Sequence, residues 1–188
     1  MSSVVTYSPA DITIYQVGNG VVLKEKSLVA IEPGKFDLLA FGDEAMKVSE
    51  GAGNVQCFSP LHQGLIDDFV SSRKLMKYML EKAFGKLTEK PALVICLPRN
   101  ATKSAVKAYE EVLYASGART VKSFAGNLDE YLNTASDKEV SRFKAIIEIG
   151  KENPEEYAKE LVSEMYARAT QFGLTKEQLV KYIEEYAE

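Results

Sequence analysis

Six consecutive apolar residues near the middle of the chain set the strongest limit on its fold. They are residues 92–97, ALVICL, and Pro98 follows them directly. A strand with one face in water alternates apolar and polar residues, whereas an unbroken apolar run is typical of a strand that is covered on both faces. The run therefore predicts an α/β domain in which helices flank a sheet on both sides.

Short strands joined by tight turns are predicted before this run. Ile12 and Ile14 alternate with polar neighbours, which is the period of a half-buried strand, and residues 18–20, GNG, supply a hairpin turn. Three more short strands are predicted over residues 21–23, 28–31 and 38–41. One or two helical turns are expected over residues 43–48, between glycines.

After residue 70 the apolar period changes to that of helices separated by apolar runs. A helix is predicted from Ser71, and a second over residues 103–116 with Gly117 as its left-handed C-cap. The remaining predictions are a strand over 119–124, a short helix over 128–132 and a last strand over 145–149. Strands followed by alternating helices and strands in this order are typical of the ribonuclease-H-like α/β fold, a single domain with a mixed sheet flanked by helices.

The tail is predicted to form an αα-hairpin, so that the chain divides into residues 1–152 and residues 153–188. Asn153 and Pro154 begin the first helix with Glu156 completing the cap, and Gly173 ends it. Thr175 and Gln178 start the second helix. The candidate interaction surface consists of the large apolar residues at helical spacing, which are Tyr157, Leu161, Met165, Phe172, Leu179, Tyr182 and Tyr186.

Two interpretations of this apolar stripe stay open. The stripe packs on its own domain, or it binds a second copy or another protein, because the hairpin is terminal and rich in tyrosine.

Composition and charge exclude several classes of protein. Hydrophobic residues make up 46% and charged residues 27% of the chain, as in a folded soluble domain. The net charge of −4 belongs to the tail: residues 1–150 carry 18 basic and 18 acidic side chains, and residues 151–188 carry 5 and 9. A neutral body with an acidic tail repels phosphate backbones, so nucleic acid is not an expected partner.

Membrane, secretion and metal signals are also missing from the sequence. It has no apolar run of about 18 residues and no readable secretory signal. Cys57 and Cys96 stand alone among apolar residues, which predicts buried thiols, not metal ligands. A cytoplasmic protein is expected.

Six segments in correct order and spacing resemble MreB, the rod-shape actin of bacteria. They span about residues 5 to 124, and six ordered matches are more specific than any one alone. The segments are 14–23 (IYQVGNGVVL, similar to LIYVKGKGIVL), 27–31 (SLVAI, similar to PSVVAI), 40–45 (AFGDEA, similar to AVGEEA), 59–69 (SPLHQGLIDDF, similar to RPLKDGVIADF), 94–98 (VICLP, similar to VVICVP) and 115–121 (ASGARTV, similar to AAGAREV).

The resemblance implies the actin-like ATPase version of this fold and identifies the chain with the first half of such a protein. The family binds ATP in a cleft between two similar halves. Only about 38 residues follow the last predicted strand here, too few for a second half, and half a cleft buries little of a nucleotide.

The family's first phosphate loop, DLGTANT, is altered at the matching residues 6–12. Thr6 occupies the position of the family's aspartate, which serves the metal; Ser8 replaces the glycine and Pro9 replaces the threonine. Asp11 lies near the end of the matching segment. Backbone N–H groups cradle phosphate in such loops, and proline has no N–H to offer. The resemblance therefore implies a degenerate loop that no longer holds a triphosphate.

Two further motifs have also changed. The family's IEEP turn, whose glutamate positions the attacking water, matches residues 124–127, FAGN, with only Asp129 or Glu130 nearby as substitutes. The second phosphate loop, DIGGGT, matches residues 148–153, EIGKEN, where one glycine remains and Glu152 adds a negative charge. We therefore expect no catalytic residue, no resident metal and no cofactor.

Three functions follow as hypotheses. The first is a non-catalytic, protein-binding module that acts on cell shape, on a cytoskeletal filament or on its own copy. The second is an ATPase completed by dimerisation, with Asp11, Asp67 or Asp68 as metal ligands. The third is a small-molecule sensor. His62, the only histidine, lies near Asp67 and Asp68 in sequence, and a histidine with two acids could form a metal or general-base site. The two acids also suit the N-terminus of a helix, where the helix dipole favours a carboxylate.

Overall fold

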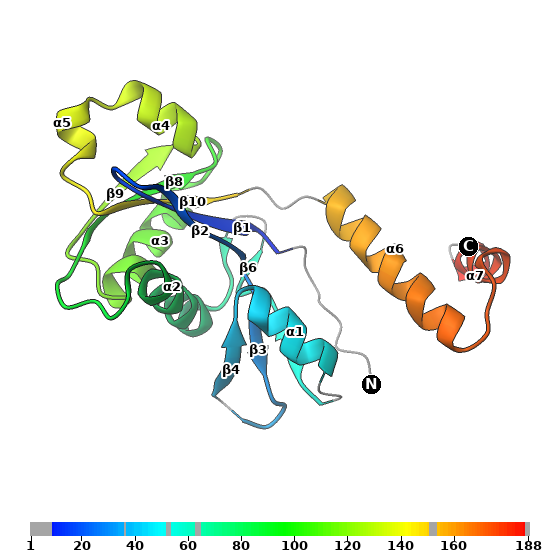
Figure 1. The fold of residues 1–188 in the computed structure, drawn as a ribbon. Coiled ribbons are helices and arrows are strands. Elements are labelled where there is room, and N and C mark those ends of the chain that lie inside the picture. Colours follow the sequence, from blue (N-terminus) through cyan, green and yellow to red (C-terminus); the bar gives the residue numbers. More distant parts are fainter. Residues whose placement is uncertain (1–8, 36, 52–53, 63–64, 151–153, 187–188) are drawn as a thin grey trace. The chain divides into compact units, whose positions relative to one another are not determined.

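A computed structural model describes residues 9–35, 37–51, 54–62, 65–150 and 154–186 (Figure 1). The chain forms two compact units, Met1–Glu152 and Asn153–Glu188. Each unit is described by itself.

A mixed five-stranded sheet organises the first unit. Its strands are β1 (Asp11–Gln16), β2 (Gly20–Lys26), β8 (Ala92–Leu97), β9 (Thr120–Ala125) and β10 (Ala145–Ile149). Their order is β2-β1-β10-β8-β9. β10 runs parallel to β8, which is parallel to β9, whereas β1 is antiparallel to both β10 and β2. The last strand along the sequence is thus the middle strand of the sheet.

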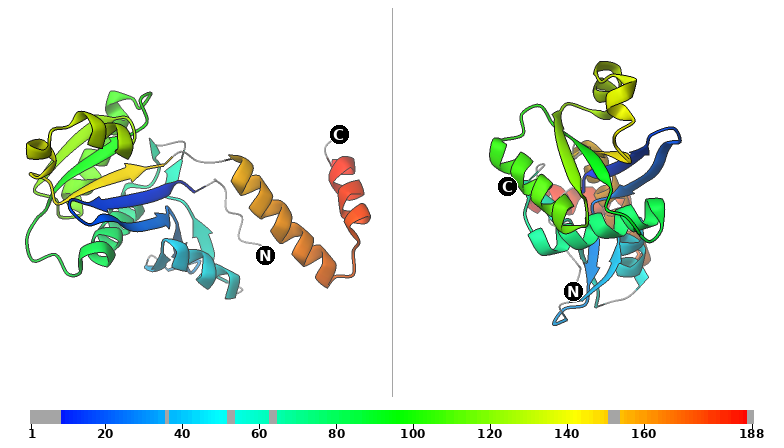
Figure 2. Two further views of the ribbon diagram at one scale, coloured as in Figure 1. Left: turned by 45° about the horizontal axis from the view of Figure 1, so that its top comes forward. Right: turned by 90° about the vertical axis from the view of Figure 1, so that its left-hand side faces the viewer.

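Helices cover both faces of this sheet (Figures 1 and 2). One face carries α2 (Phe69–Phe84) and α3 (Lys103–Ala115), and the other carries α4 (Leu128–Thr134) and α5 (Asp137–Val140). Leu93, Ile95 and Leu97 of β8 join the core with α2 and α3, and Val94 and Cys96 join the core with α4. Every residue of β8 is buried, so the strand covered on both faces is confirmed.

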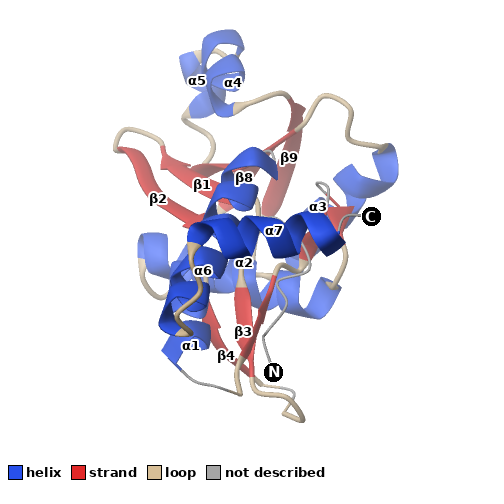
Figure 3. Ribbon diagram, turned by 90° about the vertical axis from the view of Figure 1, so that its right-hand side faces the viewer, coloured by secondary structure: helices blue, strands red, loops and turns tan. Residues whose placement is uncertain are grey.

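A smaller three-stranded sheet has its own core (Figure 3). It contains β3 (Val29–Ile31), β4 (Leu38–Phe41) and β5 (Gln56–Phe58), with α1 (Asp43–Gly51) packed on it. The short strands β6 (Leu61–His62) and β7 (Leu65–Ile66) pair with each other. The early strands therefore divide between two sheets, and β5, β6 and β7 escaped prediction because two or three residues show no period.

A buried serine joins the smaller sheet to the main sheet. Ser27 Oγ accepts a hydrogen bond from the Ala10 N–H at 3.0 Å and lies 3.0 Å from Ser59 Oγ. The Ser27 N–H in turn donates to the Ala10 carbonyl at 2.8 Å. Because Ala10 precedes β1 and Ser59 follows β5, these bonds fix the two sheets to each other within the unit.

Most predicted boundaries shift by only a few residues. α2 begins two residues earlier than predicted because Asp68 caps it, and β9 begins one residue later. α5 was missed because a four-residue helix is too short for an apolar period. Gly117 takes φ of 112° just after α3, which confirms its place at the helix end. Cys57 and Cys96 are buried, and burial raises the pKa of these thiols to about 11 and about 12.

The second unit is the predicted αα-hairpin of α6 (Pro154–Gln171) and α7 (Lys176–Tyr186). Gly173 takes φ of 76° in the connecting turn. The Thr175 N–H donates to Gln178 Oε1 at 2.9 Å and the Gln178 N–H donates to Thr175 Oγ1 at 3.3 Å, which confirms the predicted cap of α7. The cap predicted at Asn153 lies outside the described residues. Across the described residues, the length and apolarity that a membrane-crossing helix needs are not met by any helix.

Ile147 tests the central place of β10. Its side chain is fully buried, and its backbone pairs with Ile14 on one side and Ile95 on the other. We expect Ile147→Ala to lower the free energy of unfolding in urea by roughly 2 to 5 kcal/mol, because it leaves a cavity in the core between the sheet and helices α2 and α3. Val21→Ala on β2 removes a side chain that is 58% exposed and should change stability by less than about 0.5 kcal/mol. Equal effects would contradict the buried central position.

Candidate functional site

The carboxyl ends of β8, β9 and β10 meet at one edge of the main sheet. Because β1 is antiparallel to β10, β1 begins at the same edge. Ligands of open α/β sheets bind at this edge, in the crevice beyond the strand ends. The described parts of all three segments that match the resemblance's ATP motifs also fall here, at the start of β1 and at the ends of β9 and β10. This edge is therefore the candidate site.

The two phosphate-loop segments are joined directly by their main chains at this edge. Ile12 is paired with Ile149, and the Gly150 N–H donates to the Asp11 carbonyl at 2.8 Å. A β-carbon added at Gly150 would lie 3.1 Å from that carbonyl oxygen. Paired strands lie only about 4.8 Å apart, so no phosphate fits between segments that are bonded in this way. Thr6, Ser8 and residues 151–153 lie outside the described residues, and Pro9 is half-buried.

The Asp11 carboxylate is held by lysines of the neighbouring strand. Its two oxygens lie 3.4 Å from Lys24 Nζ and 3.4 Å from Lys26 Nζ. The pairing of Asp11 with Lys26 in the β1–β2 ladder brings these groups together. In the part of the chain that the structure describes, no three His, Cys, Asp or Glu residues are placed to hold a metal ion. Asp11 thus acts as a partner of two cations.

Glu130, the candidate substitute for the water-positioning glutamate, is occupied at the start of α4. Its carboxylate accepts the Asn127 N–H at 3.0 Å, the Asn127 side chain accepts the Glu130 N–H at 2.8 Å, and the Arg99 guanidinium lies 3.0 Å away. Arg99 and then the Asn127 N–H hold the pKa of Glu130 below its usual value. A β-carbon at Gly126 would require the Glu130 carboxylate to move from this position. Glu130 is an ionised capping group.

Glu148 supplies a second carboxylate to the same helix. Its Oε2 accepts the Leu128 N–H at 3.3 Å, so a side chain at the end of β10 binds the first N–H of α4. Free N–H groups at a helix N-terminus are the usual site for an anion. Here Glu130, Asn127 and Glu148 take those positions, and two negative charges stand where a phosphate would approach.

The aspartates near His62 also have a structural place. Asp68 is the N-cap of α2 and accepts the N–H groups of Val70 at 3.0 Å and Ser71 at 3.1 Å, with the Ser71 hydroxyl at 2.6 Å. The Asp67 N–H donates to the Pro60 carbonyl at 3.0 Å. The interpretation of these acids as a helix N-terminus is confirmed for Asp68.

The hairpin leaves much of its predicted interaction surface exposed. Ala169 is buried and Leu179 is half-buried, whereas Met165 is 38% and Tyr182 48% exposed. Phe172 is 84% exposed, and its predicted place on the stripe of α6 is wrong because the helix ends at Gln171. The side chains predicted at positions 157, 161 and 186 (Tyr157, Leu161 and Tyr186) lie outside the described part of the hairpin.

Sequence reasoning missed how the edge is occupied. The Asn127-to-Glu130 spacing of a capping box was readable. The bond from Leu128 to Glu148 and the ion pair of Arg99 were not, because both depend on which strands are neighbours.

Comparisons with known proteins identify the family of this chain. The model of the MreB/Mbl protein family matches residues 5–155. The cell shape-determining protein Mbl of Bacillus cereus is 38% identical over 114 residues, which cover 60% of this chain and 34% of that protein. MreB of Escherichia coli is 29% identical over 119 residues, with the same coverage.

Solved structures show the same fold. MreB5 of Spiroplasma citri bound to ADP superposes with a TM-score of 0.53 at 27% identity, over 62% of this chain and 35% of that chain. The form bound to AMPPNP gives a TM-score of 0.53 at 25% identity. The actin-like fold predicted from the sequence is confirmed. The chain spans about a third of the length of the relatives that it matches, and it belongs to the MreB/Mbl family.

Proposed function

We propose that the chain is a non-catalytic MreB-like module that binds a protein, either an MreB-type filament or its own second copy, and does not hydrolyse ATP. The hydrogen bond from the Gly150 N–H to the Asp11 carbonyl carries this proposal, because it joins the described ends of the two segments that match phosphate loops and leaves no room for phosphate between those ends. The relatives are named cell shape-determining proteins, and we place the module in that process.

The charges at the same edge support the absence of catalysis. Glu130 and Glu148 bind the first N–H groups of α4, so a triphosphate would meet two carboxylates instead of free donors. Asp11 is bound to lysines and Asp68 caps α2. No specific observation favours the alternative of an ATPase completed by dimerisation, which would use these aspartates as metal ligands.

The exposed apolar side chains of the hairpin support protein binding. Phe172, Tyr182 and Ile183 are 84%, 48% and 45% exposed. Aromatic side chains are enriched at the buried centre of protein interfaces, and exposed apolar groups gathered on a short segment mark binding surfaces. We assign the contact with the partner to this part of α7 and the turn before it.

The first prediction concerns nucleotide binding. Titration of the full chain with ATP and Mg²⁺ in a calorimeter should show no tighter binding than tripolyphosphate gives, and phosphate release should equal the blank, because Gly150 and Asp11 bond to each other at the matching loop positions. MreB5 of Spiroplasma citri, whose structures hold ADP and AMPPNP, is the positive control. Micromolar affinity with Mg²⁺-dependent turnover would overturn the proposal.

The second prediction concerns the hairpin. The full chain should either self-associate in sedimentation velocity or co-sediment with polymerised Mbl. The combined change Phe172→Ser, Tyr182→Ser and Ile183→Ser should weaken that association at least about tenfold, since each exposed apolar group lost costs about 1 kcal/mol or more at an interface.

A matched control separates this effect from a general loss of surface apolarity. Val21→Ser and Val70→Ser remove side chains that are 58% and 55% exposed on the first unit, and they should leave the association unchanged. Absence of both associations in the unaltered chain, or an equal loss in the control, would count against a hairpin interface.

A further inference from the structure

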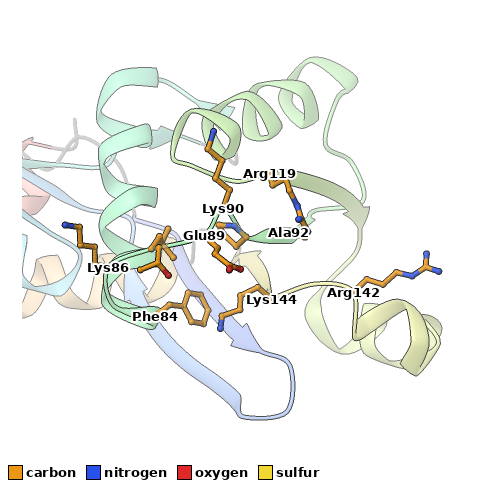
Figure 4. A pocket seen from close by; sticks show the side chains of 11 residues that line it. Phe84, Lys86, Glu89, Lys90, Ala92, Arg119, Arg142 and Lys144 are labelled. Carbon is orange, nitrogen blue, oxygen red and sulfur yellow. The ribbon is translucent and has the colours of Figure 1, made fainter.

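The opposite edge of the main sheet carries a hollow that several cationic side chains line (Figure 4). The hollow has a volume of about 630 Å³ and lies where β8, β9 and β10 begin. Its five cations are Lys86, Lys90, Arg119, Arg142 and Lys144, and its single acid is Glu89. The first unit as a whole has no surplus of positive charge, so the cations are gathered here by the fold.

Main-chain bonds set the spacing of two of these cations. The Arg119 N–H donates to the Pro91 carbonyl at 2.8 Å on one side of β8, and the Lys144 N–H donates to the Ala92 carbonyl at 2.8 Å on the other side. Each residue stands directly before its strand. Two strand spacings therefore separate their backbones, which is about 10 Å. The sheet fixes the distance between these two backbones, whereas residues on a surface loop have no such fixed spacing.

These cations have no salt-bridged acidic partner in the described part of the chain, although Arg142 interacts electrostatically with Glu139. None of the five takes part in a salt bridge, whereas Lys24 and Lys26 of β2 and Lys122 of β9 do. Glu139, which lies near Arg142, is already bound by Lys122. Lys144 Nζ lies 5.4 Å above the ring of Phe84, an arrangement that keeps the ammonium over the hollow. Like charges gathered in this way repel one another unless an anion joins them.

We propose that this hollow binds a ligand that carries two or more phosphate groups. A single phosphate carries a charge of only about −2, fewer than the five positive charges that line the hollow, whereas linked phosphates carry more. The volume lies within the range of about 300 to 1,000 Å³ that is usual for small-ligand sites. Arginine and lysine are the side chains that bind phosphate most strongly. The phosphates come either from a free oligophosphate or from the headgroups of an anionic lipid surface.

The site is independent of the proposed function. It lies at the amino ends of the parallel strands, whereas the closed phosphate-loop edge lies at their carboxyl ends. Failure of either proposal leaves the other standing.

The test titrates the full chain with tripolyphosphate and, separately, with orthophosphate. We expect saturable binding of tripolyphosphate at least tenfold tighter than that of orthophosphate. Arg119→Gln combined with Lys144→Gln should weaken it at least tenfold. The control, Lys77→Gln with Lys107→Gln, also removes two exposed cations, from α2 and α3 outside the hollow, and should keep the original affinity. A thermal melt checks that both variants fold.

A second arm identifies the source of the phosphates. The chain is sedimented with phosphatidylcholine vesicles that contain or lack phosphatidylglycerol. Binding only to the phosphatidylglycerol vesicles, lost in the Arg119 and Lys144 variant and displaced by tripolyphosphate, assigns the site to a lipid surface. Tripolyphosphate binding without vesicle binding assigns it to a free ligand. No saturable binding to either, or equal losses in the variant and the control, overturns the site.

Discussion

The main-chain ladders on the two sides of β10 are the interaction on which the first unit depends. β10 pairs with β1 through antiparallel bonds and with β8 through parallel bonds. Without it, the sheet would consist of two separate pairs, β1 with β2 and β8 with β9. β1 and β10 lie at opposite ends of the unit's sequence, so the sheet closes only after nearly all of that sequence is available. Long-range pairing of this kind has a high entropic cost, which the fully buried side chains of Ile146 and Ile147 offset.

The same ladder links the stability of the sheet to the contact between Gly150 and Asp11 at its carboxyl edge. The register that sets Ile12 opposite Ile149 also brings Gly150 to Asp11, since the pair continues by one more bond at the edge. A chain that opened this edge for a triphosphate would give up part of the pairing that holds its central strand. β10 also positions Glu148 to bind the N-terminus of α4. Sheet closure and the capping of α4 therefore both fill this edge with groups of the protein itself.

The sequence predicts individual helices, strands and turns well, but it predicts poorly which strands lie side by side in the sheet. The apolar run of β8, the glycines at Gly18 and Gly20 and the cap of α7 depend on a few adjacent residues, and each took the predicted place. Apolar period shows that residues 145–149 form a strand but not that this strand lies between β1 and β8. The occupied edge and the cationic hollow both follow from that placement. Phe172 marks another limit, because helical spacing does not reveal where α6 ends.

The two edges of the sheet differ in how their charges are paired: acids of the carboxyl edge have cationic partners, whereas the cations of the amino edge form no salt bridge in the described part of the chain. At the carboxyl edge, the partly positive N–H groups of α4 attract acids, and Glu130 and Glu148 satisfy them. At the amino edge, cations stand directly before the strands, as Arg119 and Lys144 do. The two proposals together put a phosphate ligand at this amino edge and none at the carboxyl edge, where open α/β sheets usually bind their ligands.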